Sequence, residues 1–390
     1  MTVDLKYGCN PHQVPARLLA ASDVLPLRIL NGTPGYINIL DALGAWQLVR
    51  ELAKATGLPS AASFKHTSPA GAAVATGELS EAFRTTQMLP DTELSPIATA
   101  YARARAGDRI CSYGDAVAVS DEVDVTLAHL LVREVSDLII APHYTPEALA
   151  LLKAKKNGGY LVLQMDPAYE PPELESREVF GLMLQQKRNT AVINHDTFCH
   201  IVTPGKSVPD DVLRTLMVGT IALKYTQSNS VCVAYDGQVI GMGAGQQSRI
   251  HCTRLACDKA DKWLLQQHTR VCEAKFRPRL KRVDKFNLID QYLSWEHLSE
   301  IEERAMLEGF IESPQPLTRE ERQVWLHTFD GICLCSDAFI PFRDNIDRAS
   351  RSHVQYVAQT GGGLRDAEVT AAAEQHGMVM IHTGLRLFAH

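Results

Sequence analysis

The chain is organised around the stretch Ser63-Phe64-Lys65-His66-Thr67-Ser68-Pro69-Ala70-Gly71. An apolar run ends in a Lys-His pair, Ser68-Pro69 is expected to turn the chain, and small residues then restart it. This pattern predicts a strand whose tip presents two nitrogen groups beside a tight turn. Histidine titrates near neutrality and lysine can hold a developing charge, so such a tip suits proton transfer. A Lys-His pair alone is more often an ordinary surface or core pair, so other stretches must decide.

Composition excludes several classes of protein. The 390 residues allow two or three domains, and 45% hydrophobic with 22% charged residues is ordinary for a globular protein. A net charge of −6 argues against a whole surface that binds polyanions. The start of the chain has no signal pattern, and no apolar stretch reaches the roughly 20 residues of a membrane span. We therefore expect a soluble, cytoplasmic protein that binds neither membrane nor nucleic acid.

Helix and strand patterns alternate between residues 97 and 165. Strands are expected at 116–119, 138–142 and 160–163, and helices at 98–105, 125–135 and 146–155. This alternation indicates an α/β sheet with helical cover, in which ligands lie beyond the carboxyl ends of strands. Loops 112–115 and 136–137 are therefore candidate lining of a site. Earlier in the chain, Asp41 is expected to cap the helix that precedes the Lys-His strand.

A second unit follows the proline-rich and glutamate-rich linker 167–175. A helix leads to the polar motif 224–230, and the Asp236-Gly237 dipeptide predicts a hairpin over 231–243. A glycine-rich loop containing Arg249 is then expected to enter a helix over 253–267 and suits an anion or a polar heterocycle. Further on, Thr318 and Glu321 predict a capping box.

Four stretches emerge from this organisation. They are a first α/β unit with the Lys-His pair (1–172), the first part of a second α/β unit (173–265), a mainly helical insert (266–330) and the completion of the second unit (331–390). The nine cysteines are scattered without a Cys-x-x-Cys pair, so we expect reduced thiols.

Six ordered motifs occur together in one known family. They are Lys6-Tyr7-Gly8-Cys9-Asn10-Pro11-His12-Gln13, Ser63 to Gly71, Lys224-Tyr225-Thr226-Gln227-Ser228-Asn229-Ser230, Gly245-Gln246-Gln247-Ser248-Arg249-Ile250, Ser336-Asp337-Ala338-Phe339 and Arg386-Leu387-Phe388. From about Lys6 to His390, the chain closely resembles the formyltransferase part of bifunctional purine-biosynthesis proteins, 5-aminoimidazole-4-carboxamide ribotide (AICAR) transformylase. The resemblance implies a fold of two cytidine-deaminase-like, three-layer α/β/α units with a helical insert.

The resemblance also implies a reaction. A formyl group would pass from the co-substrate 10-formyltetrahydrofolate to the 5-amino group of AICAR, giving formyl-AICAR and tetrahydrofolate in purine (IMP) biosynthesis. His66 would act as general base, Lys65 would stabilise the oxyanion or assist proton delivery, and Asn229 would complete the catalytic set. A homodimer with shared active sites is implied, as is a structural monovalent cation, K⁺, near Thr226, Ser228 and Asp337.

The binding residues are carried over position by position from the family's motifs. The phosphate and ribose end would be held by Lys6, Tyr7 and Arg386. The ribose and heterocycle would be held by Asp137, Asn229, Arg249, Phe339 and Phe388, with Gly114 close by. The co-substrate would be lined by Ile250, Asn287, Phe339, Pro341 and Asp344, with Ile110 and Tyr113 on its wall.

Departures from the family's pattern keep alternatives open. Lys6 stands where arginine is usual, Ile340 where a second phenylalanine is common, and Ala389 where histidine is usual. Nothing here corresponds to the family's N-terminal cyclohydrolase domain, so we expect a separate IMP cyclohydrolase to act on the product. A different formyl carrier, a related amino-imidazole, and a non-catalytic ribotide-binding protein are the alternatives. A zinc deaminase is disfavoured and no zinc is expected, because the His/Cys-x-Glu and Pro-Cys-x-x-Cys signatures are missing.

Overall fold

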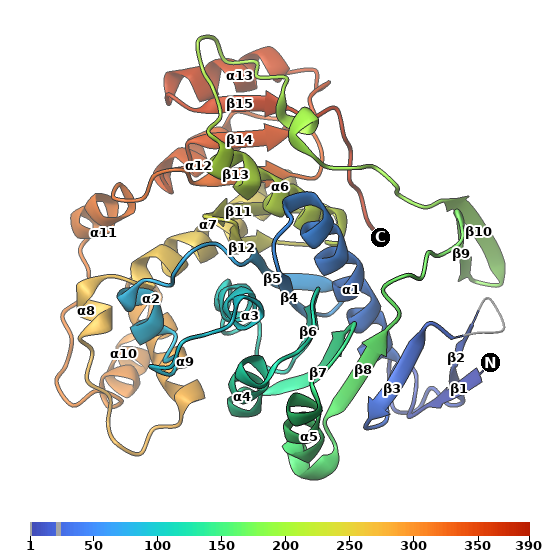
Figure 1. Ribbon diagram of the computed structural model, residues 1–390. Coiled ribbons are helices and arrows are strands. Elements are labelled where there is room, and N and C mark those ends of the chain that lie inside the picture. The colour runs from blue at the N-terminus through green and yellow to red at the C-terminus, as the bar shows by residue number, and fades with distance from the viewer. Residues whose placement is uncertain (1, 21–24) are drawn as a thin grey trace.

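The computed structural model describes residues 2–20 and 25–390 (Figure 1). Within that part of the chain, eleven strands form one continuous mixed sheet. In spatial order they are β15 (Val379–His382), β14 (Tyr356–Gln359), β13 (Cys333–Ser336), β11 (Val231–Tyr235), β12 (Gln238–Gly243), β5 (Ser68–Val74), β4 (Ser60–Lys65), β6 (Asp115–Val119), β7 (Ser136–Ala141), β8 (Leu161–Met165) and β3 (Leu27–Asn31). The expected α/β class is confirmed.

The sheet contains two five-strand units with the same topology. One runs β5-β4-β6-β7-β8 and the other β12-β11-β13-β14-β15. In each, an antiparallel hairpin is followed by a strand antiparallel to it and then by two strands parallel to that one. The units meet edge to edge where Gln238 of β12 pairs with Ala73 of β5. Strand β3 extends the outer edge of the first unit, antiparallel to β8.

Helices cover both faces of this sheet (Figure 1). One face packs against α1 (Tyr36–Thr56) and α6 (Asp210–Lys224). The opposite face packs against α3 (Pro96–Ala106), α4 (Val125–Arg133), α5 (Pro146–Ala154), α7 (Arg249–Gln266), α12 (Asp344–Arg351) and α13 (Asp366–Gln375). No helix in the described ranges combines the length and the apolar character of a membrane span.

Smaller elements lie outside these layers. They are α2 (Glu81–Thr86), α8 (Thr269–Cys272), α9 (Arg282–Leu293), α10 (Glu300–Leu307), α11 (Arg319–Leu326), the ribbon of β1 (Thr2–Leu5) with β2 (Ala16–Leu19), and the ribbon of β9 (Leu174–Val179) with β10 (Leu182–Lys187). The capping box expected at Thr318 and Glu321 is confirmed at the start of α11.

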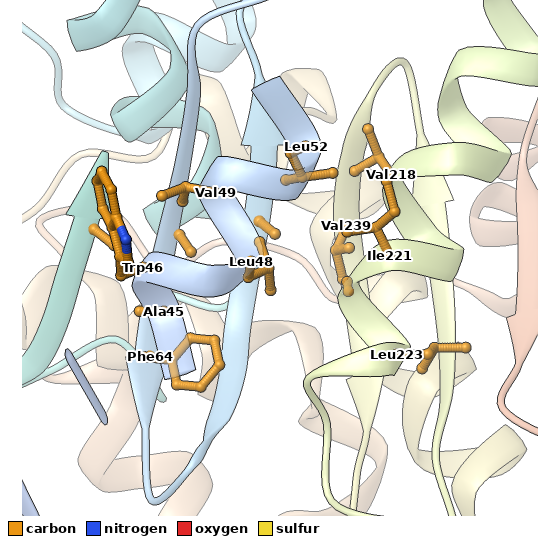
Figure 2. Close-up of a cluster of buried hydrophobic side chains, with 14 of the residues drawn as sticks. Ala45, Trp46, Leu48, Val49, Leu52, Phe64, Val218, Ile221, Leu223 and Val239 are labelled. Carbon is orange, nitrogen blue, oxygen red and sulfur yellow. The ribbon is translucent and has the colours of Figure 1, made fainter. Parts of the chain in front are cut away.

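Alternate side chains of β4 pack into two different hydrophobic cores, one on each face of the sheet. Ala62 and Phe64 pack toward α1, whereas Ala61 packs toward α3. Successive strand side chains point to opposite faces, so a strand covered on both sides reads as a continuous apolar run. Figure 2 shows Leu52 of α1 close to Val218 of α6, so the two helices share the core above the sheet. The central hairpins β4–β5 and β11–β12 are therefore packed against helices on both faces of the sheet.

Two expected helix starts are wrong. Helix α1 begins at Tyr36 behind Gly35, whose backbone N–H donates to Asn38 Oδ1 at 2.9 Å, so Asp41 lies inside the helix and does not cap it. Helix α7 begins at Arg249, four residues before the expected start. Arg249 therefore belongs to the first turn of a helix and not to the glycine-rich loop. The hairpin at Asp236-Gly237 is confirmed, with positive φ at both residues.

The close approach of α3 to β5 generates a prediction. A Cβ added to Gly71 would lie 2.1 Å from the backbone oxygen of Ala104, which cannot move without shifting the helix. Gly71→Ala should lower the free energy of unfolding by about 3 kcal/mol, measured by urea denaturation. Gly35→Ala is the control, because its added Cβ would approach only a side-chain oxygen, at 3.3 Å. Equal midpoints for Gly71→Ala and the parent chain would contradict the packing argument.

Candidate active site

The two-residue turn between β4 and β5 carries the proton-transfer candidates. Lys65 pairs with Ser68, so His66 and Thr67 are the turn residues, with φ of 54° and 60°. Positive φ at both positions is the signature of a type I′ hairpin. The turn thus lies two residues before the expected Ser68-Pro69 position, because Ser68 already belongs to β5. Both turn residues are exposed, and the His66 imidazole is presented at the end of the sheet.

Helix α1 holds this turn. The backbone N–H of Thr67 donates to Asp41 Oδ1 at 2.6 Å, and Asp41 is itself buried. Burial raises the pKa of the Asp41 carboxyl, while the Thr67 amide and the His66 imidazole oppose that rise. Asp41 was expected only as a helix cap, so sequence reasoning missed this contact.

Lys65 is fixed separately from His66. Its Nζ donates to the backbone oxygen of Tyr113 at 2.5 Å. Two residues before Lys65 in β4, Ser63 Oγ donates to Asp115 Oδ2 at 2.6 Å. Arg105 Nη1 donates to the other oxygen of Asp115 at 2.6 Å. The Lys65 ammonium is therefore held by the backbone of residues 107–114, while the buried Ser63–Asp115–Arg105 network fixes the strand that carries it.

Asp137 lies beside the same loop and has a cationic partner. A Cβ added to Gly114 would lie 3.7 Å from Asp137 Oδ2, and Lys156 Nζ donates to Asp137 Oδ1 at 2.8 Å. Asp137 and Lys156 are both about half exposed, so both can reach a ligand. Lys156 was missed by sequence reasoning. Its only signal was a Lys-Lys-Asn-Gly turn before a buried strand, a pattern that usually marks a solvated loop.

A pocket of about 370 Å³ opens next to Lys65. It contains Ile110, Tyr113 and Asn287, which were expected on the co-substrate wall, but its lining does not include Ile250, Pro341 or Asp344. The remaining charged lining residues are Arg105, Arg109, Arg133, Glu134, Arg282 and Asp284. Cations outnumber carboxylates here, so the pocket favours an anionic ligand.

Glu134 is the buried centre of these cations. Its carboxylate contacts Arg105 and Arg109, each at 3.2 Å, and Arg282 at 2.5 Å. Burial alone would raise the pKa of Glu134, but the three guanidinium groups outweigh it and lower the pKa to about 2. The network joins two separate segments at the pocket, the end of α3 with the residues that follow it and the start of α9.

Asn229 belongs to a second buried network. Asp337 is fully buried, and its Oδ2 accepts from Ser228 Oγ at 2.7 Å and from Ser230 N–H at 2.8 Å. Arg249 forms an ion pair with Asp337 Oδ1, and its Nη2 donates to Asn229 Oδ1 at 2.8 Å. Arg249 therefore orients the Asn229 amide so that Nδ2 remains available as a donor. A monovalent cation near Thr226, Ser228 and Asp337 stays a prediction, at a carboxylate that Arg249 already neutralises.

The C-terminal segment 383–390 is hydrogen-bonded to this network through its backbone. Leu387 N–H donates to the Asp337 backbone oxygen at 2.8 Å, and Ser228 N–H donates to the Ala389 backbone oxygen at 3.0 Å. Arg386 and Phe388 remain exposed, with the guanidinium 5.1 Å from the centre of the ring. Ala389 is held through its backbone, so alanine in place of the family's usual histidine leaves these hydrogen bonds of the C-terminal segment intact.

Two further contacts place the other predicted segments. Lys6 N–H donates to the Pro34 backbone oxygen at 3.1 Å, which ties the N-terminal motif to the start of α1. Gln227 N–H donates to Ser68 Oγ at 3.2 Å, which joins the loop that carries Asn229 to the base of the His66 turn.

Phe339 is exposed, whereas Ile340 is buried in the core. The departure at Ile340 from the family's usual phenylalanine therefore changes core packing and not an exposed wall of the site.

Glu134 generates a pH-dependent prediction. Because its pKa falls from the ordinary 4.5 to about 2 on folding, its stabilisation is complete above about pH 4.5 and is lost as the pH falls toward 2. Glu134→Gln should cost about 3 kcal/mol at pH 7, since it leaves the buried Arg109 without a carboxylate partner and Arg105 with Asp115 alone. The difference in urea midpoint between Glu134→Gln and the parent chain should be smaller at pH 3.5 than at pH 7. Glu312→Gln, which removes an exposed pair with Lys275, should cost under about 1 kcal/mol, and equal losses would contradict the argument.

Comparison with known proteins gives consistent matches. The profile of a family described as AICARFT/IMPCHase bienzyme matches residues 1–259. The Bifunctional purine biosynthesis protein PurH of Sorangium cellulosum is 30% identical over 99% of this chain and 58% of its own length. The protein of the same name from Magnetococcus marinus is 29% identical over 99% of this chain and 59% of its own. The chain thus spans less than two thirds of the curated relatives that it matches.

Proposed function

The chain belongs to the AICARFT/IMPCHase bienzyme family, and from this premise we propose that it is the formyltransferase of purine biosynthesis. It would transfer the formyl group of 10-formyltetrahydrofolate to the 5-amino group of AICAR. The observation that carries the proposal is the His66 turn. His66, exposed in the turn, directly follows Lys65 in the chain, and the independently held Lys65 ammonium lines the cationic pocket.

The reaction needs a proton to move between the two substrates. The amine nitrogen attacks the formyl carbon, a new C–N bond forms, and the bond from that carbon to N10 of the folate breaks. The 5-amino group is a weak nucleophile, because its lone pair is delocalised toward the carboxamide, and it must lose a proton as it attacks. His66 accepts that proton, and N10 of the leaving tetrahydrofolate gains one.

The other residues bind, polarise and orient. Lys65 stabilises the negative charge that develops on the formyl oxygen. The Asn229 amide, oriented by Arg249, donates to the ribotide. Lys6, Tyr7, Asp137 and Arg386 offer the charged and polar groups for the phosphate and ribose. Lys156, bonded to Asp137, adds a third cation, after Lys6 and Arg386, for the phosphate.

The pocket favours the co-substrate as the occupant beside Lys65. Ile110 and Tyr113 offer apolar walls to a flat heterocycle, and the arginines around Glu134 suit the carboxylates of a folate tail. A formyl group delivered from this pocket would arrive next to the Lys65 ammonium.

A direct assay tests the proposed function. Purified protein, AICAR and 10-formyltetrahydrofolate are mixed, and tetrahydrofolate release is followed spectroscopically together with IMP formation. Release that requires AICAR supports the transferase, and the IMP reading shows separately whether the product is also closed to a ring. Absence of release, with AICAR binding still seen by calorimetry, would favour another formyl carrier or a binding protein.

His66→Ala should lower turnover by about 10²–10⁴-fold, because the amine loses its base. AICAR affinity, measured by calorimetry, should change little. His297→Ala is the control, since His297 is an exposed histidine of the helical region. Unchanged turnover in His66→Ala would remove His66 from the role of base.

We also propose a homodimer, and the β9–β10 ribbon supports it. These two strands pair only with each other among the described elements, and every residue in them is exposed. Leu182 and Leu184 lie on one face, with Phe180 fully exposed at the tip. A lone two-stranded ribbon is marginally stable in water, and a row of exposed apolar side chains marks a contact surface.

Light scattering after size exclusion tests this surface. The double variant Leu182→Asp with Leu184→Asp should convert a dimer to a monomer at micromolar concentration, because charges would be buried unpaired at the interface. Gln185→Asp, on the opposite face of the same strand, should leave the mass unchanged. A dimer of unaltered stability in the double variant would exclude the ribbon as the contact.

A further inference from the structure

The turn that presents His66 is conformationally costly. Type I′ turns favour Asn-Gly and similar pairs because both central residues need positive φ. Here the two positions hold a histidine and a threonine, and the left-handed region costs a non-glycine residue roughly 1 kcal/mol or more. Thr67 is β-branched, which makes its φ of 60° a clear outlier. A contact outside the hairpin is needed to hold this conformation.

Asp41 is in the place to supply that contact. It lies on the buried face of α1 between the core residues Ala42 and Ile39, with only 7% of its surface exposed. A carboxylate in such surroundings is unfavourable unless it is hydrogen-bonded. Among the described residues Asp41 forms no ion pair, although the nearby His66 imidazole lowers its pKa, and its Oδ1 accepts the Thr67 N–H at 2.6 Å. The helix therefore carries a buried carboxylate whose partner is the backbone of the turn.

We propose that Asp41 is a positioning residue, which holds the His66–Thr67 turn in its left-handed conformation and thereby aims the His66 imidazole at the reacting amine. This inference rests on the proposed formyl transfer. Lys65 is anchored independently through Tyr113, and the pocket is built from other segments, so loss of the Asp41 contact should misplace the base without dismantling the binding groups. Errors of about 1 Å in such a group can cost about a hundredfold in rate.

Kinetics of two Asp41 variants test the proposal. Asp41→Ala removes the acceptor and should lower kcat by about tenfold to a hundredfold, with the KM of both substrates within about threefold of the parent. Asp41→Asn keeps a side-chain oxygen that can accept the Thr67 N–H and should retain most of kcat. Equal losses in the two variants would overturn the hydrogen-bond argument.

Asp124→Ala is the matched control. Asp124 Oδ1 accepts the Leu127 N–H at 2.8 Å at the start of α4, so this variant also loses one carboxylate–amide bond, away from the turn. Its free energy of unfolding should fall, as an N-cap loss does, while kcat stays unchanged. A comparable kcat loss in Asp124→Ala would show that Asp41 acts through general stability, and the proposal would fail.

Thr67→Gly separates positioning from folding. Glycine adopts positive φ without strain, so adding Thr67→Gly to Asp41→Ala should restore part of kcat. This double variant also keeps the test decisive if Asp41→Ala alone folds poorly. No recovery in a folded double variant would count against the proposal.

A readout without catalysis distinguishes this inference from the proposed function. In the parent chain labelled with ¹⁵N-threonine, the Thr67 amide should exchange slowly with solvent, and Asp41→Ala should accelerate that exchange at least tenfold. If the parent transfers no formyl group, the proposed function fails while this measurement still decides whether Asp41 holds the turn. Unchanged exchange in Asp41→Ala would overturn the inference.

Discussion

Direct backbone contact between two helices and the two central strands of the sheet is the constraint on which the rest of the structure depends. An added Cβ at Gly71 of β5 would lie 2.1 Å from the Ala104 oxygen of α3, and one at Gly241 of β12 would lie 2.1 Å from the Ala256 oxygen of α7. Only glycine permits such an approach. Because β5 and β12 join the two units, these contacts fix both hairpins at the seam. They also set where the His66 turn stands relative to the Asn229 loop.

Local signals in the sequence were sufficient for the fold class, and they singled out Lys65 and His66 without fixing a role for the pair. Strands covered on both faces appear as apolar runs, and an Asp-Gly pair between two such runs specifies its own turn, so these elements were found from short windows. Lys65 and His66 were recognised because an apolar run ended abruptly in two nitrogen groups. Each of these signals arises from residues a few positions apart.

The features that were missed depend on contacts between distant segments. Asp41 has the sequence signature of a helix cap, and only the packing of α1 against the hairpin brings its carboxylate to the Thr67 amide. Arg249 looks like a free loop cation, but a helix that begins four residues early buries it against Asp337. Lys156 becomes significant only because β8 lies beside β7, which carries Asp137. No local window contains these pairings.

Sheet register explains how a strained turn can persist at the end of the two central strands β4 and β5. Strand β4 pairs with β5 on one side and with β6 on the other, where Phe64 is opposite Ala116. A slip of one residue would exchange the two faces of β4, turning Phe64 away from the α1 core and Ser63 away from Asp115. The hairpin therefore cannot relieve its turn by sliding. The sheet constrains the left-handed residues from one side and α1 constrains them from the other, so His66 is presented by a turn that is held on both sides.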